Sequence, residues 1–160
     1  MGQCNSTFFR NRNRNRNRNI NKDKNVDFDL INSSIGEYYS FSGRRVNAKI
    51  VQVYDGDTCT AIFRLNDSME SPLIQYKIRL AGIDTPELRP SLSIQDRDLI
   101  IEKAKEAKKV VEEKILNKLV FLQCNEFDKY GRILATIITS EGLNLNQWLL
   151  DNGYAVNYKC

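Results

Sequence analysis

Alternating apolar and polar positions predict five β-strands in this chain. Residues 46–54 and 58–65 are rich in β-branched side chains, and the tight-turn sequence Asp55-Gly56-Asp57 separates them. The remaining strands are expected at residues 74–81, 119–124 and 133–139. In the third strand Arg79 falls on the polar face, so a packed core would hold its backbone still while the side chain stays accessible.

Two segments show helical periodicity instead. The first follows Ser93, which lies three residues before Asp96 as in a capping box. Its apolar face is expected to consist of Ile100, Ala104, Ala107, Val111 and Ile115. The second runs from about residue 144 to 152 and ends before Gly153, the expected C-cap. Its inward side chains are expected to be Leu145, Trp148 and Leu149. This order of strands and helices predicts an α+β fold that is mainly a small β-barrel.

The composition excludes several kinds of catalytic site. The chain contains no histidine, which removes His-based zinc sites and Ser-His or Cys-His catalytic pairs. Any acid–base chemistry near neutral pH therefore falls to carboxylates, lysine, tyrosine or a metal-bound water. The four cysteines show no metal-like spacing, and we expect reduced thiols.

Charge divides the 160 residues into two parts. Residues 1–45 hold nine Lys/Arg and four Asp/Glu, whereas the other 115 residues hold fifteen and sixteen. The unbroken alternation of arginine and asparagine from Arg10 to Asn19 cannot bury apolar surface. We expect a disordered basic tail and linker over residues 1–42 and one folded domain over residues 43–160. The arginines could bind anionic lipid or nucleic-acid phosphates, or they could only keep the chain in solution.

The first six residues fit the N-myristoylation pattern, with Gly2 as the acceptor and Ser6 at the expected position. Cys4 could carry a palmitoyl group, and two acyl chains hold a protein stably on a bilayer where one does not. The pattern is short, and the alternative is an ordinary polar N-terminus. We find no apolar run long enough for a membrane span and no signal-peptide core. We therefore expect a cytoplasmic, non-secreted protein that lipidation could attach to a membrane surface.

The third predicted strand ends in a turn that carries both signs of charge. Asp84, Thr85 and Glu87 follow Arg79, and Pro86 fixes the backbone between them. One cation and two carboxylates at a strand end suit a site for a phosphate and a hard metal ion. The alternative is a charged turn at the rim of a barrel without any ligand.

Two other turns carry related side chains. Asp55-Gly56-Asp57-Thr58 presents carboxylates, and Asp128-Lys129-Tyr130-Gly131-Arg132 presents an arginine beside a tyrosine. With Arg79 and Asp84-Thr85-Pro86-Glu87, these segments resemble the staphylococcal nuclease (thermonuclease) family in order and spacing, from Val46 to about Tyr158. The resemblance implies a five-stranded OB-fold barrel with two packed helices. It also implies cleavage of DNA and RNA with Ca²⁺, leaving 3′-phosphate ends.

The resemblance assigns roles to the acidic turns. It implies that Asp57, Asp84 and the backbone carbonyl of Thr85 bind the metal ion, and that Asp55 supports this metal site. Glu87 matches the acid that acts as general base for the attacking water. The chemistry of these groups agrees, because a donor set of oxygen atoms alone selects Ca²⁺ or Mg²⁺ over zinc or copper.

The resemblance also implies residues that bind the substrate. Arg79 and Arg132 match the two arginines that bind the phosphate, and a guanidinium binds two phosphate oxygens at once where lysine cannot. Tyr130 matches the aromatic residue beside the base, with Lys129 next to it as a phosphate contact. Tyr158 lies near the position of a family tyrosine, although the register differs by one residue.

Two features leave an alternative open. The loop after Glu87 is shorter and less rich in lysine than in the bacterial enzyme, which affects the expected substrate preference. Some domains of this family bind nucleic acid without cutting it, as many OB-folds bind single strands. The catalytic reading is favoured because the acids and both arginines are present. In either case we expect a monomer whose partners are DNA and RNA.

Overall fold

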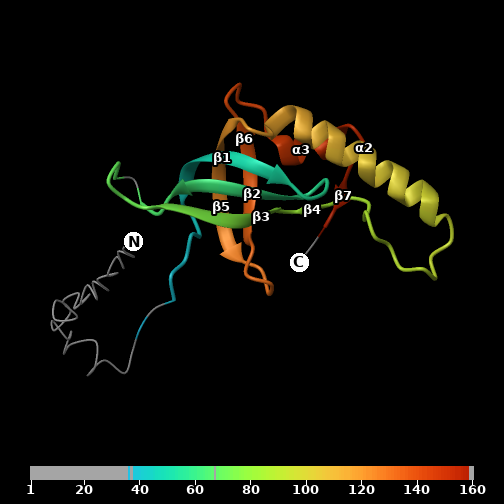
Figure 1. The fold of residues 1–160 in the computed structure, drawn as a ribbon, viewed down its shortest axis with the longest axis horizontal. Helices are drawn as coiled ribbons and strands as arrows, with labels where there is room; N and C mark the ends of the chain where they lie inside the picture. Colours follow the sequence, from blue (N-terminus) through green and yellow to red (C-terminus); the bar gives the residue numbers. More distant parts are fainter. Residues whose placement is uncertain (1–35, 37, 67, 159–160) are drawn as a thin grey trace, which may run out of the picture. The chain divides into compact units, whose positions relative to one another are not determined.

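The computed structural model describes residues 36, 38–66 and 68–158, and Tyr39–Cys160 form one compact unit (Figure 1). The elements in chain order are β1 (Arg45–Val53), β2 (Thr58–Arg64), β3 (Leu73–Leu80), β4 (Ile83–Asp84), α2 (Arg97–Ile115), β5 (Leu119–Phe127), β6 (Ile133–Thr139), α3 (Leu145–Asp151) and β7 (Val156–Asn157). The predicted acylation site at Gly2 and Cys4 and the Arg10–Asn19 repeat lie outside the described residues.

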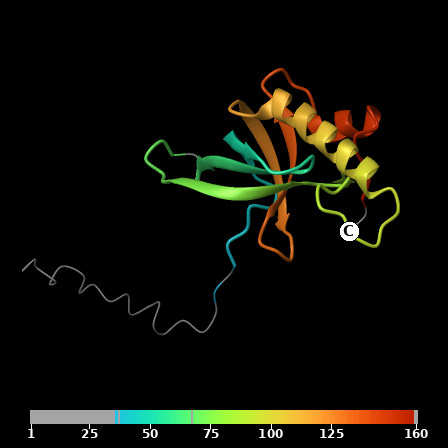
Figure 2. The same ribbon diagram turned by 45° about the vertical axis from the view of Figure 1, so that its right-hand side comes forward.

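Five strands close into a barrel in the order β1-β2-β3-β6-β5. Neighbouring strands are antiparallel except β3 and β6, which run parallel where Ile78 lies beside Ile133. Register shifts between Ile50 and Gln52 in β1, and after Cys124 in β5, let the strands bend toward closure. Figure 2 shows α2 and α3 on the same side of the barrel. The predicted α+β barrel with two helices is confirmed.

The core lies inside the barrel and beneath α2 and α3. Alternate positions of the strands point inward, as the period-two pattern predicts. The largest fully buried strand residues are Ile50, Phe63, Ile78, Leu80, Ile83, Leu122, Ile133 and Ile137. Ala104, Ala107, Val111 and Ile115 of α2 are buried as expected, whereas Ile100 is half-buried. In α3, Leu145 and Leu149 are buried, and Trp148 is half-buried with its ring stacked on Tyr154.

Helix and strand ends differ in places from the expected ones. The capping box was wrong, because α2 begins at Arg97 after Asp96, whose φ of 57° is left-handed and whose side chain makes no capping hydrogen bond. Ser93 instead lies within hydrogen-bond distance of Ser91 in the preceding loop. Strand β5 continues to Phe127, three residues beyond the predicted end, because its register shift allows pairing to resume. Gly153 follows α3 with a φ of +74°, as expected at a helix C-terminus.

The short strands β4 and β7 were not predicted, and they position one of the charged turns. Ile83 pairs with Asn157 and Asp84 with Val156. The amide of Tyr158 also donates to the carbonyl of Gly82 at 2.9 Å. The end of the chain therefore holds the turn after β3 in place and brings Tyr158 to the same end of the barrel. Within the described part of the chain, no helix combines the length and the apolar character needed to cross a membrane.

Candidate active site

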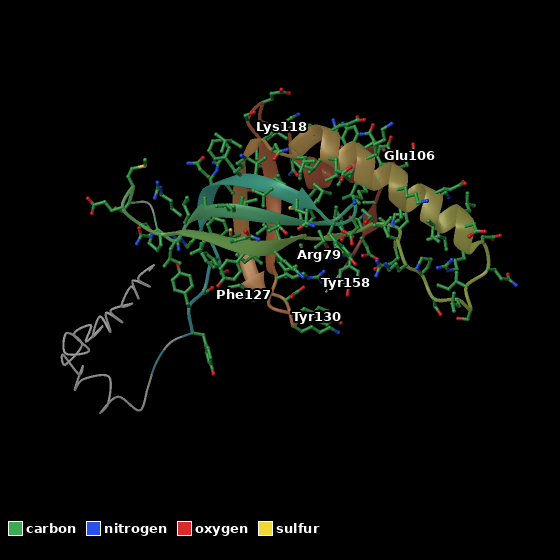
Figure 3. All side chains as sticks on the ribbon, in the orientation of Figure 1. Arg79, Glu106, Lys118, Phe127, Tyr130 and Tyr158 are labelled. Atoms are coloured by element: carbon green, nitrogen blue, oxygen red, sulfur yellow. The ribbon has the colours of Figure 1, made fainter. Side chains whose placement is uncertain are left out.

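Two of the three charged turns line a cleft of about 560 Å³ at one end of the barrel, and the third, the β1–β2 turn, contacts them through Asp57 and Thr58. Arg79 and Asp84 line it from the end of β3 and the following turn, and Tyr130 and Arg132 line it from the β5–β6 turn. Tyr158 lines it from the segment after β7. Figure 3 shows Arg79, Tyr130 and Tyr158 at this end of the molecule. Residues far apart in the sequence thus share one concave surface.

Asp57 is the buried centre of the site. Its Oδ2 atom accepts hydrogen bonds from the amide and the hydroxyl of Thr85, both at 2.9 Å. Its Oδ1 atom accepts from the hydroxyl of Thr58 at 3.1 Å. The side chain of Asp57 is only 8% exposed, and burying a carboxylate is costly unless its oxygens accept such hydrogen bonds. These bonds connect the β1–β2 turn to the turn after β3.

Arg79 joins two carboxylates with one guanidinium. Its Nη1 atom lies 2.9 Å from Oδ2 of Asp57, and its Nη2 atom lies 2.6 Å from Oδ1 of Asp84. The Arg79 side chain is only 12% exposed, so the expectation that it stays accessible was wrong, because the two carboxylates enclose it; the side chain of Asp84 is 44% exposed toward the cleft. The fixed planar guanidinium holds both acids in a defined relative position.

Gly56 allows the two acidic turns to approach each other. A Cβ atom at this position would lie 2.8 Å from the Oγ1 atom of Thr85 and 2.9 Å from its Cβ atom. Any larger residue would therefore displace Thr85 and weaken both of its hydrogen bonds to Asp57. The glycine in the turn sequence Asp55-Gly56-Asp57 is thus needed for close packing.

The β5–β6 turn holds Arg132 in a similar way. Asp128 Oδ2 accepts from Nε of Arg132 at 2.6 Å, while Asp128 Oδ1 accepts from the amides of Tyr130 and Arg132. The guanidinium of Arg132 lies 5.4 Å from the ring centroid of Tyr130, and Nζ of Lys129 lies 5.0 Å from the same ring. Burial alone would raise the pKa of Asp128, but the hydrogen bonds and the charge of Arg132 lower it overall.

A chain of contacts joins the two arginines. The Nη1 atom of Arg132 lies 3.4 Å from the hydroxyl of Thr58, which donates to Asp57. Asp57 contacts Arg79, and Arg79 contacts Asp84. In the described residues no buried side-chain nitrogen or oxygen lacks a hydrogen-bond partner. The site is therefore a fully satisfied polar network with one side open to the cleft.

Asp55 lies at the edge of this network and accepts a hydrogen bond from the amide of Asp57 at 3.2 Å. Burial, followed by the charge of Asp57, raises the pKa of Asp55 to about 6. Asp55 is therefore partly protonated near neutral pH in the absence of a cation. A positive charge bound nearby would favour its ionised form.

The donor set fits a hard cation only in part. Asp57 and Asp84 contact the same guanidinium, so both carboxylates lie in one small region of the site. Oxygen ligands of this kind suit Ca²⁺ or Mg²⁺. In the described part of the chain, however, no group of three or more His, Cys, Asp or Glu side chains could hold a metal ion. Backbone carbonyls and water would have to supply the remaining ligands.

Comparison with known proteins agrees with this geometry. Residues 77–160 match the staphylococcal nuclease homologue family. A protein of Methanocaldococcus jannaschii, named only as uncharacterized, is 32% identical over 161 residues, which cover 83% of this chain and 74% of its relative. The chain belongs to the staphylococcal nuclease family.

Two further relatives carry functional names. An uncharacterized endonuclease of Escherichia coli is 29% identical over 71% of this chain and 62% of its own length. Endonuclease YhcR of Bacillus subtilis is 32% identical over 79% of this chain but only 9% of its own length. The chain thus spans a small part of YhcR and less than two thirds of the Escherichia coli protein.

Except for Glu87, the residues that the family resemblance indicated lie in the contact network or line the cleft. Glu87 is exposed, and among the described residues it has no ion pair or side-chain hydrogen bond. It follows Thr85 and Pro86 on the turn, outside the contact network. Its predicted role as general base remains a prediction.

Four residues of the site received no individual role from the sequence. Thr58 and Asp128 orient the charged groups, and Gly56 allows the two turns to approach. Asn146 of α3 is buried, with its amide nitrogen 2.9 Å from the carbonyl of Ala81 and its oxygen 3.1 Å from the amide of Ile137. The spacing of Asp128 and Arg132 could have indicated an ion pair, whereas no local pattern indicates Asn146.

Neither of the two cysteines in the described part of the chain lines the cleft. Cys59 and Cys124 are buried, free thiols. Burial is the main cause that raises the pKa of Cys59 to about 12 and that of Cys124 to about 11. Both thiols are therefore protonated and unreactive near neutral pH.

Proposed function

We propose that this protein is a Ca²⁺-dependent nuclease that hydrolyses phosphodiester bonds of DNA and RNA and leaves 3′-phosphate ends. The observation that carries the proposal is the contact network joining Arg132, Thr58, Asp57, Arg79 and Asp84 beside one cleft. Two of the relatives bear the name endonuclease, which supports the same activity. The fold alone would not support it, because OB-fold barrels have many functions.

The arginines would stabilise the reacting phosphate. Attack on a phosphodiester places additional negative charge on the nonbridging oxygens, and Arg79 and Arg132 both line the cleft where that charge would develop. Their side chains are already held by Asp57, Asp84 and Asp128. Little reorganisation is then needed during the reaction, which favours the transition state.

The acids would bind the metal ion and direct the water. Asp57, Asp84 and the carbonyl oxygen of Thr85 would hold Ca²⁺, with Asp55 supporting them from the β1–β2 turn. The bound ion would supply positive charge to the phosphate oxygens and lower the pKa of water. Glu87 would accept the proton of the attacking water as the P–O5′ bond breaks, and the departing O5′ atom would take a proton from solvent to become a 5′-hydroxyl. The exposed position of Glu87 gives it access to solvent.

The decisive experiment is a cleavage assay on plasmid and on labelled single-stranded DNA and RNA. We expect cleavage with Ca²⁺, none with chelator, and products whose gel mobility changes after phosphatase treatment. Asp84→Asn should remove most activity, because it weakens both the metal site and the contact with Arg79. Asp98→Asn, on an exposed position of α2, is the matched control and should keep it. A folded protein that cuts no substrate with any divalent metal would contradict the proposal.

A second candidate is a module that binds single-stranded nucleic acid in this cleft without cutting it. The separation of Glu87 from the contact network favours this alternative. It predicts oligonucleotide binding in chelator that Arg132→Gln weakens, together with no cleavage in any metal. Glu87→Gln separates the two candidates, since it should abolish cleavage in the nuclease and leave binding unchanged in either case.

A further inference from the structure

Exposed aliphatic side chains gather at the end of the barrel opposite the cleft. Met69 in the β2–β3 loop is 78% exposed, Leu73 at the start of β3 is 64% exposed, and Leu119 at the start of β5 is 68% exposed. With Ile62 they line a groove of about 590 Å³ on the outer surface of the sheet. We call this surface the hairpin face, and it consists of Lys49, Ile62, Arg64, Met69, Leu73 and Leu119. Figures 1 and 2 show the β2–β3 hairpin projecting away from α2 and α3.

Basic residues alternate with the aliphatic ones on the hairpin face. Lys49 lies opposite Ile62 on one neighbouring strand and opposite Leu119 on the other. Arg64 lies opposite Leu73. Strands β1, β2 and β3 contain no Asp or Glu, whereas the loop between β2 and β3 contains two acids, Asp67 and Glu70. The strands of this surface therefore combine apolar groups with positive charge.

The first residues of the folded unit, Tyr39 to Arg44, contact the base of the β2–β3 hairpin. The hydroxyl of Tyr39 donates to the carbonyl of Leu65 at 3.1 Å, and Nη1 of Arg44 donates to the same carbonyl at 2.9 Å. Leu65 is the first residue of the β2–β3 loop. The ring of Phe41 is buried next to Phe63.

We propose that the hairpin face docks on the surface of a membrane that contains anionic phospholipid. Met69 and Leu73 would enter the boundary between headgroups and acyl chains, while Lys49 and Arg64 would contact lipid phosphates. Leu73 and Arg79 occupy opposite ends of β3, about 20 Å apart at the rise of a strand. The cleft would therefore stay open to the solution. This inference does not depend on the nuclease activity.

The side-chain chemistry favours lipid over two other occupants. Binding of single-stranded nucleic acid uses aromatic rings for stacking, whereas Ile62, Met69, Leu73 and Leu119 are aliphatic. A second copy of the chain in a two-fold arrangement would place the basic residues of both copies in the same interface, where they repel each other. Anionic headgroups complement the charge, and acyl chains complement the aliphatic groups.

Vesicle cosedimentation of the full chain, made without acylation, tests the proposal. We expect binding to phosphatidylcholine vesicles with about 30% phosphatidylserine, little binding to phosphatidylcholine alone, and release at high salt. The double variant Met69→Glu/Leu73→Glu should bind at least about tenfold more weakly, since it removes the apolar groups and adds negative charge. Lys49→Ala and Arg64→Ala should each cost roughly fivefold.

A matched control separates the hairpin face from the basic tail, which is the same in every variant. Leu92→Glu/Leu99→Glu replaces two exposed leucines near the start of α2 and should bind vesicles like the unmodified sequence. Circular dichroism should show the same fold in both double variants. Equal vesicle binding by the two double variants would overturn the proposal, because the basic tail alone would then account for the binding. Loss of oligonucleotide binding or of self-association, with vesicle binding unchanged, would overturn it in favour of nucleic acid or a second copy.

Discussion

The two ends of β3 show opposite ways of using polar and apolar side chains. At the cleft end, Arg79 contacts two carboxylates and is almost fully enclosed. At the hairpin end, Leu73 is 64% exposed, and Arg64 on the neighbouring strand donates to one backbone carbonyl, that of Ser71. The cleft end is held rigid by bonds within the protein, whereas the hairpin end directs its side chains outward. Substitutions at the two ends should therefore have very different consequences.

The largest difference is expected between Arg79→Gln and Arg64→Gln in the cleavage assay without lipid. Arg79→Gln should lower kcat/KM by about 10²–10³, because it removes a charge that stabilises the reacting phosphate. Arg64→Gln should change it by no more than about threefold, through long-range attraction of the substrate alone. Similar losses in both variants would show that general positive charge, and not the cleft geometry, supports activity.

The charged turns of the cleft end could be recognised in the sequence because they are short local motifs, whereas their roles came from the family resemblance and stay predictions. Asp57, Arg79 and Arg132 each belong to a turn or strand end whose pattern is visible over a few residues. The five strands of the barrel could be predicted for a similar reason, because period-two alternation is visible within each strand. The two-residue strands β4 and β7 are too short to show a pattern, and their pairing depends on contacts between distant segments.

The hairpin end could not be predicted in this way. Leu73 and Leu119 are separated by 46 positions, and each by itself is an ordinary strand residue. They share one surface only through the register of β5 against β1, β1 against β2, and β2 against β3. Asn146 was missed for a related reason, since its partners Ala81 and Ile137 belong to other elements.

Asn146→Ala should lower the free energy of unfolding more than the substitutions of Asn47, Gly56 or Gly36 do. It leaves the carbonyl of Ala81 and the amide of Ile137 without this buried partner, and we expect the free energy of unfolding to fall by about 3 kcal/mol. Asn47→Ala, on the exposed face of β1 near the hairpin end, should change it by less than about 0.5 kcal/mol. Urea denaturation followed by tryptophan fluorescence measures both. Equal, small effects would mean that water can replace the Asn146 amide.

Gly56→Ala should have a smaller effect on stability and a clear effect on the site. The added methyl group would lie 2.8 Å from the Thr85 hydroxyl, so Thr85 must move away from Asp57. We expect a loss of about 2 kcal/mol in the free energy of unfolding, together with lower metal-dependent activity. At Gly36 a Cβ atom would have nothing within 4 Å, so Gly36→Ala should leave both unchanged. An unaffected Gly56→Ala protein would show that the turns separate without cost.

The smallest expected effect is a change in how stability depends on pH, caused by Asp55. Its pKa of about 6 in the folded protein exceeds the ordinary value of 3.8, so folded Asp55 keeps a proton that the unfolded chain releases between these values. Raising the pH through that window therefore lowers stability, and Asp55→Asn removes this contribution. With chelator present, the gain in unfolding free energy from Asp55→Asn should be greater at about pH 7.5 than at about pH 4.5. Glu70→Gln, at the exposed hairpin end, should show no such difference. Parallel pH profiles for Asp55→Asn and the unmodified protein would mean that the cleft end leaves this carboxyl as well solvated as one at the hairpin end.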